Sequence, residues 1–159
     1  MDYGVLIRRA IPEDAAAIAR VLRDSFAEFE ELYTRGGFAA TVLNPEGVRL
    51  RVEEGPVWVA MPIGEIAGTA SVVCKGESDL YVRGLAVVPR ARGHGLAAAL
   101  LSEVERFARQ EQCQRLFLTT TPFLDSAIRL YERSGYKRVL NGERDLFGTP
   151  LFTMEKVND

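Results

Sequence analysis

The chain has 159 residues, of which 47% are hydrophobic and 26% are charged, and its formal net charge at pH 7 is −2. This size fits a single soluble domain over residues 1–159 with a core large enough to fold unaided. The charge argues against a nucleic-acid-binding surface, and no apolar run reaches the ~18 residues that a membrane helix needs. Cys74 and Cys113 form no CxxC motif and the N-terminus lacks a signal pattern, so we expect a cytoplasmic protein.

The first third of the chain predicts a strand and two helices. Residues 5–9 read as a strand, and a helix is expected to begin at Pro12, because proline and acidic residues suit a first helical turn. Residues 29–41 are predicted to be irregular, with a break at Gly36-Gly37, before a second helix over about residues 44–55. Apolar residues at helical spacing predict one buried stripe on the first helix: Ala17, Ile18, Val21, Leu22 and Phe26.

From residue 57 onwards the apolar period changes to two, which predicts an antiparallel meander. A helix is expected after the glycines at 93 and 95, as far as about residue 110, and a short helix near the C-terminal end. The expected strands are 57–61, 65–74, 79–88, 115–121, 136–140 and 150–156, with the short helix at 125–134. This order predicts a mixed α/β fold in which helices pack on a largely antiparallel sheet.

The segment VVPRARGHGLAAALL (87–101) raises the main functional question, because an apolar run stops and then restarts as a helix. A helix start exposes unpaired N–H groups and the positive end of the helix dipole. Gly93 and Gly95 let a ligand approach the backbone where a Cβ would block it, and Arg92 adds charge, which suits a phosphate or pyrophosphate. The alternative is a flexible turn whose glycines serve only steric needs.

Three phosphate-binding motifs compete for this segment. A P-loop is excluded, because the last glycine is followed by Leu-Ala instead of Lys and Ser or Thr. A Rossmann fingerprint matches GHGLAA (93–98) by letter, but residues 89–92 separate it from its strand and the next strand ends in threonines. The third pattern, V-x-P-x-x-R/Q-G-x-G-x-G/A between a strand and a helix, is matched by residues 87–97 and resembles the coenzyme A loop of the GNAT superfamily of N-acetyltransferases.

A second element of that family, A-x-x-L-Y-x-x-x-G-F/Y, is matched by AIRLYERSGY (127–136). The two motifs stand in the family's order with a strand between them, and the expected element order over essentially the whole chain is also the family's. The resemblance implies one GNAT-like domain of the α/β (α+β) class. Its mixed, mostly antiparallel sheet would have helices on both faces and splayed central strands.

The resemblance also implies acetyl-CoA as co-substrate, and no metal. The backbone around Leu85, Ala86 and Val87 would pair with the amides of pantetheine, as a peptide adds to a sheet edge. The pyrophosphate would lie beside Arg92 on the N–H groups of the loop and helix start. The implied contacts there are Gly93, His94, Gly95, Leu96, Ala97 and Ala98. His94 is the single histidine, which excludes a multi-histidine metal site.

By the same resemblance Tyr131 is the general acid for the coenzyme thiolate, since a phenol with a pKa near ~10 is only slightly more basic than a thiolate. The alternative is a packed tyrosine whose hydroxyl bonds to the backbone. Two positions depart from the family. Leu124 stands where many relatives have asparagine, and Tyr81, not a carboxylate, holds the inward position on the splayed strand. Deprotonation of the amine is therefore left to water or to the amine's own ionisation.

The segment between the first two helices closes the acceptor site in the family. Aromatic residues there interleave with glutamates, which would suit a cationic amine on an apolar stem. Candidate substrate-binding residues are Phe29, Glu30, Tyr33 and Tyr81. Alternatively the aromatic side chains pack inward and the glutamates face water. Residues 147–152 fit either the other wall of this site or a contact in a homodimer.

The expected function is an acetyl-CoA-dependent N-acetyltransferase that transfers the acetyl group directly to a primary amine of a small molecule. No nucleic-acid or membrane partner is expected. Two alternatives stay open. One is acetylation of a peptide or protein amine. The other is a non-catalytic acyl-CoA-binding or sensing module, which the missing carboxylate and Leu124 favour and Tyr131 opposes.

Overall fold

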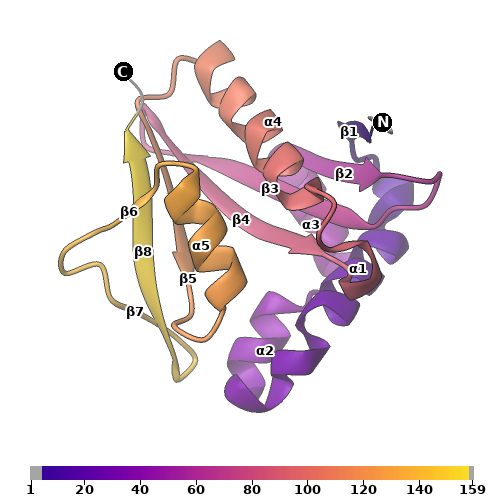
Figure 1. Cartoon of the computed structure of the whole chain (residues 1–159), viewed down its shortest axis with the longest axis horizontal. Coiled ribbons are helices and arrows are strands. Elements are labelled where there is room, and N and C mark those ends of the chain that lie inside the picture. Colours follow the sequence, from indigo (N-terminus) through magenta and orange to yellow (C-terminus); the bar gives the residue numbers. More distant parts are fainter. Residues whose placement is uncertain (1–4, 158–159) are drawn as a thin grey trace.

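One mixed β-sheet runs through the computed structural model, which describes residues 5–157 (Figure 1). The strand order is β1-β2-β3-β4-β5-β8-β6, and β7 pairs only with β8. The strands pair antiparallel except for β4 and β5, which are parallel. Their bounds are β1 Leu6–Arg9, β2 Val57–Met61, β3 Gly68–Lys75, β4 Asp79–Val87, β5 Arg115–Thr120, β6 Lys137–Arg138, β7 Arg144–Leu146 and β8 Thr149–Val157.

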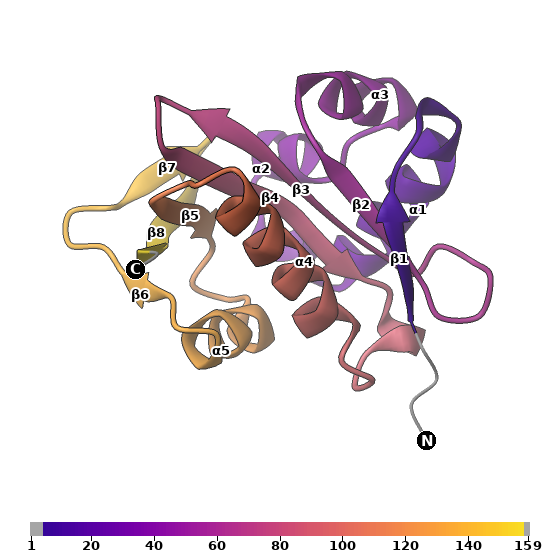
Figure 2. The ribbon, with the colours of Figure 1, turned by 90° about the horizontal axis from the view of Figure 1, so that it is seen from above.

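Helices cover both faces of this sheet. The helices are α1 Ala15–Phe26, α2 Arg35–Thr41, α3 Pro45–Glu54, α4 Leu96–Gln110 and α5 Asp125–Arg133. Seen from above, α1, α2 and α3 lie on one side of the sheet and α4 and α5 on the other (Figure 2). None of the helices between residues 5 and 157 meets the length and hydropathy needed to span a bilayer. The mixed sheet with helices on both faces confirms the predicted fold class.

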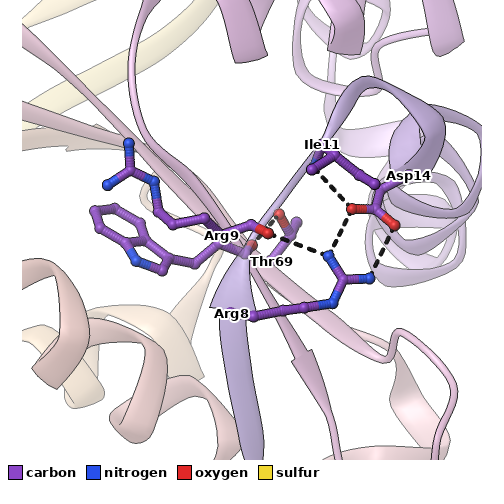
Figure 3. Close-up of polar contacts among 6 residues, drawn as sticks. Arg8, Arg9, Ile11, Asp14 and Thr69 are labelled. Atoms are coloured by element: carbon purple, nitrogen blue, oxygen red, sulfur yellow. Dashed lines mark hydrogen bonds and ion pairs between the residues drawn. The ribbon is translucent and has the colours of Figure 1, made fainter.

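The first helix is fixed to the first strand by a charged side-chain contact. Arg8 on β1 donates two hydrogen bonds to the Asp14 carboxylate, at 2.8 and 3.0 Å, and Asp14 also accepts from the Ile11 N–H at 2.9 Å (Figure 3). These bonds hold the pKa of Asp14 below its usual value. On the other side of the strand, Arg9 lies over the Trp58 ring, with 5.4 Å from its Cζ to the ring centroid. The bonds between Arg8 and Asp14, the N-cap of α1, thus attach the start of this helix to β1.

The core lies on both sides of the sheet and follows the predicted apolar stripe of α1. Ile18, Val21 and Leu22 are buried, whereas Ala17 and Phe26 are half-buried. On the opposite face, α4 buries its apolar stripe against β2, β3 and β4. Full burial of each such side chain stabilises the fold by about 1.5–3 kcal/mol. The helices that flank the functional segments are therefore firmly attached to the sheet.

The segment predicted to be irregular, residues 29–41, is instead largely helical. A 3₁₀ turn over Ala27–Leu32 precedes α2, whose first turn is capped by the Thr34 hydroxyl accepting from the Gly37 N–H at 3.0 Å. The two glycines do not break the helix but allow it to pack closely. A Cβ added at Gly37 would lie 2.3 Å from Oγ1 of Thr149, and one added at Gly36 would lie 2.8 Å from Cβ of Phe147.

Smaller differences occur at the sheet edges. The strand expected over residues 136–140 is reduced to the two residues of β6, and β3 begins at Gly68 instead of residue 65. The short strand β7 was not predicted. By contrast, α3 begins as expected, since the Asn44 side chain caps it by accepting from the Gly47 N–H at 2.8 Å and Pro45 follows.

Candidate active site

The two parallel strands at the centre of the sheet pair over only three residues each. Residues 79–81 of β4 align with residues 115–117 of β5, although β4 continues to Val87 and β5 to Thr120. At the paired end, Arg115 forms ion pairs with Asp79, at 3.1 Å, and with Glu155 on β8. Beyond residue 81 the strands separate, which confirms the predicted splay. We call this opening the split.

A β-bulge directs the backbone of β4 into the split. The register with β3 shifts between Thr69 and Ser71, opposite Gly84, which has a φ of +68°. Past the bulge, the Val88 N–H donates to the Ala67 carbonyl on the β3 side at 2.9 Å. Ala86 and Val87 are aligned with Thr69 and Gly68 of β3. Because backbone groups alternate in direction along a strand, Leu85 and Val87 direct theirs towards the split, although the Val87 carbonyl accepts a hydrogen bond from Arg92.

The glycine loop between β4 and α4 presents backbone N–H groups to solvent. Gly93 and Gly95 have φ values of +83° and +79°, and Gly95 is the N-cap of α4. No side chain within residues 5–157 caps this helix, and its first intrahelical bond runs from the Ala99 N–H to the Gly95 carbonyl. A Cβ added at either glycine would meet no atom of the described chain within 4 Å. The loop therefore has the form of an anion site made of backbone.

The remaining loop residues contribute mainly through their position. His94 is exposed between the two glycines, Leu96 is buried in the core, Ala97 is half-buried and Ala98 is exposed. Of these four side chains, only that of His94 carries a polar group that can bind a phosphate. The N–H groups of Leu96, Ala97 and Ala98 belong to the first helical turn, which has no intrahelical acceptor for them.

Arg92 points away from the helix start. Its Nε donates to the Val87 carbonyl at 3.2 Å, Nη2 donates to the Ser25 carbonyl at 2.9 Å, and Nη1 forms an ion pair with Glu28. The side chain thus fastens the loop to the end of α1 and to the 3₁₀ turn that follows. An anion on the loop would meet the N–H groups first and the charge of Arg92 only as a neighbour.

Tyr131 lies on α5 with only 7% of its surface exposed. Burial, with a contribution from neighbouring Tyr33, raises the pKa of Tyr131 above its usual value. The hydroxyl is therefore protonated at neutral pH and can act as a proton donor. The influence of Tyr33 on this pKa shows that the predicted general acid and one predicted acceptor residue are brought close together.

Tyr33 is the centre of an aromatic cluster in the segment predicted to close the acceptor site. Its ring centroid lies 4.9 Å from that of Phe123, 5.9 Å from that of Phe38 and 6.4 Å from that of Phe26. Burial raises the pKa of Tyr33 to about 12. Phe29 packs on Phe123 at 6.1 Å, while the neighbouring glutamates, at positions 28, 30 and 31, are exposed. The aromatic side chains pack inward and the glutamates, Glu30 among them, face water.

The turn between β7 and β8, a predicted second wall of this site, is attached to α2 through Thr34. The Thr34 N–H donates to Oγ1 of Thr149 at 2.9 Å, and the Thr34 hydroxyl donates to the Phe147 carbonyl at 2.7 Å. Thr149 is 1% exposed. These contacts join segments 115 residues apart, and they are absent from the sequence-based prediction. A threonine just before a helix is an N-cap signal that would have revealed the start of α2.

Tyr81 lies on β4 at the beginning of the split. Its ring stacks on Phe117 at 5.0 Å, and its hydroxyl is 3.1 Å from Oγ1 of Thr119 on β5. A residue not predicted for the site, Arg51 of α3, reaches the same strand. The sequence gives no signal that Arg51 lies against β4, because it is one of several charged residues on a predicted helix.

The comparisons with known proteins agree with this geometry. A family model described as the acetyltransferase (GNAT) family matches residues 18–136. The N-acetyltransferase YjgM of Escherichia coli is 32% identical over 138 residues, which cover 84% of this chain and 83% of that protein.

Two solved structures share the fold. The PaiA N-acetyltransferase of Thermoplasma acidophilum, in complex with coenzyme A, has a TM-score of 0.80 at 16% identity and covers 98% of this chain and 99% of its own. The acetyltransferase yncA of Salmonella typhimurium, with its cofactor acetyl-CoA, has a TM-score of 0.76 at 21% identity over 98% of this chain and 95% of its own. The family match and its N-acetyltransferase relatives define this protein as an acyltransferase. More narrowly, the chain belongs to the GNAT family of acetyltransferases.

Proposed function

We propose that the protein transfers an acetyl group from acetyl-CoA directly to a primary amine of a small molecule. The observation that carries this proposal is the split between β4 and β5, together with two features of the helices, namely the uncapped start of α4 and the buried Tyr131 of α5. The first feature suits a pyrophosphate and the second a proton donor. A sensing module would need only the first.

The residues present fit acetyl-CoA. Leu85 and the N–H of Val87 direct backbone groups into the split, where a chain bearing two amides can pair with them as an added strand, while the Val87 carbonyl accepts from Arg92. The loop from Arg92 to Ala98 would hold the pyrophosphate on its N–H groups, and the space over Gly93 and Gly95 is open. Bound there, acetyl-CoA supplies a thioester that an amine can attack.

Each protein group has a distinct proposed role in the transfer. A backbone N–H of β4 at the split would polarise the acyl carbonyl, which favours the developing negative charge. Tyr131 would donate its hydroxyl proton to the sulfur as the carbon–sulfur bond breaks and the carbon–nitrogen bond forms. The proton that the amine loses would go to water, because no carboxylate occupies the inward position of Tyr81.

The acceptor side favours a small molecule over a protein. The Thr34 contacts hold the β7–β8 turn against α2, and the aromatic cluster around Tyr33 packs inward. An extended polypeptide would need an open groove at this position. We place the reaction in the cytoplasm, since two cysteines without scaffold spacing suit a reducing compartment.

An amine panel assayed by release of free thiol from acetyl-CoA tests the proposal, together with a thermal-shift titration of acetyl-CoA. Saturation at 100 times Kd should stabilise the protein by about 2.7 kcal/mol, and ATP serves as the control for non-specific anion binding. Acetylation of small amines supports the proposal. Binding without turnover of any amine would identify a sensing module, turnover of peptides alone would identify a peptide acetyltransferase, and the absence of an acetyl-CoA shift would overturn the assignment of the loop.

A further inference from the structure

Two arginines, Arg51 and Arg83, lie beside the split on the face of the sheet that carries α1 and α3. Arg51 projects from α3 onto β4, where its Nη1 would be only 2.7 Å from a Cβ added at Gly84. Gly84 directly precedes Leu85, the first residue past the bulge whose backbone faces the split. The Arg51 guanidinium therefore lies against β4 next to the proposed site of acyl transfer.

The charges of this arginine pair are incompletely balanced. Arg83 forms an ion pair with Glu54, yet its Nε is buried and has no hydrogen-bond partner within residues 5–157. Over the same described residues, Arg51 makes neither a side-chain hydrogen bond nor an ion pair. Burial, reinforced by the charge of Arg83 and opposed by that of Glu54, lowers the pKa of Arg51 to about 10. The Arg51 guanidinium is thus charged at neutral pH, and it shares the nearby Glu54 carboxylate with Arg83.

Hydroxyl groups lie near the pair, although apolar side chains of α1, α3 and β2 also line the space around Arg51. Tyr81 and Thr119 place their hydroxyl groups 3.1 Å apart on the two strands that border the split. Tyr81 is also close enough to Arg51 to affect its pKa. The glycine loop begins α4 on the opposite face of the sheet (Figure 2). An acyl group that reaches through the split from that side would meet its acceptor near these residues.

We propose that the acceptor amine carries a carboxylate, as an α-amino acid does, and that Arg51 and Arg83 bind that carboxylate. This inference rests on the proposed N-acetyltransferase function. A guanidinium binds a carboxylate through two parallel N–H···O bonds, and a buried cation without a full partner is costly until such an anion arrives.

The first test needs only the wild-type protein. Values of kcat/KM are compared for phenylalanine, phenylalanine amide and 2-phenylethylamine, and for the corresponding leucine series. We expect the free carboxylate to be preferred over the amide and the decarboxylated amine by about 100-fold, the size of a strong charge-assisted contact. Equal or faster acetylation of the compounds without a carboxylate would overturn this inference alone. Failure to bind acetyl-CoA or to acetylate any amine would instead overturn the proposed function.

Variants then assign the preference to the arginine pair. Arg51→Gln should lower the ratio of kcat/KM for phenylalanine to that for 2-phenylethylamine by about 30-fold, and Arg51→Lys by less. Arg49→Gln, on the same helix but exposed, is the matched control and should leave this ratio unchanged. A purely structural role for Arg51 would lower both rates in parallel and preserve the ratio.

A change at Glu54 provides a second test that does not require the Arg51 variants to fold. It should change the ratio of kcat/KM for phenylalanine to that for 2-phenylethylamine in the opposite direction. Glu54 competes with a substrate carboxylate for Arg83. Glu54→Gln should therefore raise the ratio several-fold. A lowered ratio in this variant would contradict the proposed role of the arginine pair.

Discussion

The two sides of the active site are built from different material. The proposed coenzyme side is backbone from one continuous stretch, residues 85–98, shaped by glycines with positive φ. The proposed acceptor side consists of side chains from α1, the following 3₁₀ turn, α2, α3 and the β7–β8 turn. A backbone site depends on local conformation and tolerates most side-chain changes. A site made of side chains can be altered one residue at a time. Substitutions there can therefore change the choice of acceptor while coenzyme binding is retained.

The largest expected effect comes from a change at Tyr131, the proposed proton donor. Tyr131→Phe should lower kcat about 100-fold, because positioned acids contribute about 10²–10⁴-fold, and should change the acetyl-CoA affinity less than about two-fold. The measurements are steady-state thiol release and a thermal-shift titration. In the wild-type protein, loss of kcat through ionisation of Tyr131 should appear only above pH ~10, since its pKa is raised.

Tyr136→Phe is the control for this change. Tyr136 is equally buried, its ring centroid is 5.9 Å from that of Tyr131, and its hydroxyl has no hydrogen-bond partner in the described chain. Removing that hydroxyl should leave kcat unchanged. Equal activity of the two phenylalanine variants would remove Tyr131 from the mechanism.

The next largest effect should follow a change in backbone conformation on the coenzyme side. Gly95→Val forces a β-branched residue into a positive φ at the start of α4 and places a side chain over the loop. We expect acetyl-CoA binding to weaken by about 10–50-fold, measured by thermal shift and by KM.

Two matched variants separate conformation from side chain. Gly76→Val imposes the same strain at a φ of +66° in the β3–β4 turn, with equally open surroundings, and should cost stability without changing acetyl-CoA affinity. His94→Ala changes only a side chain in the loop and should alter the affinity by less than about three-fold. A large loss of affinity in His94→Ala would show that the coenzyme side is not built mainly from backbone.

The smallest expected effect tests the wall of the acceptor side. Thr149→Val removes the acceptor of the Thr34 N–H and should destabilise the fold by about 1–2 kcal/mol, lowering Tm by about 3–6 °C. We expect KM for the amine to rise while KM for acetyl-CoA stays constant. Thr149→Ser keeps the hydroxyl and should restore most of the loss. An equal rise in both KM values would mean that the wall is not specific to the acceptor side.

The same difference between the two sides decides what could be predicted from the sequence. Features of one continuous stretch could be predicted, whereas contacts between distant segments could not. The glycine loop, the helix after it and the position of Tyr131 were predicted because their signals lie within short stretches of chain. The helix α2 was missed because Gly36 and Gly37 act through contacts with Phe147 and Thr149, more than a hundred residues away.

The contact partners of individual side chains could not be predicted from the sequence either. Arg92, the predicted phosphate neighbour, contacts Ser25 and Glu28, and Arg51 of α3 reaches Gly84; neither set of contacts could be read from the sequence. Contacts of this kind depend on how elements pack, and neither spacing nor residue type encodes them locally.

The split also bears on the stability of the protein in solution. Unpaired strand edges are the places where sheets of different molecules join and aggregate. Here the unpaired backbone of β4 lies inside the sheet, bordered by β3 and β5, with α4 and α5 over one face and α1, α2 and α3 over the other. A strand from another protein would have to bring side chains above and below the sheet, where these helices stand. A slender chain of amides without side chains would not, so the fold can keep a reactive edge permanently available while excluding other polypeptides.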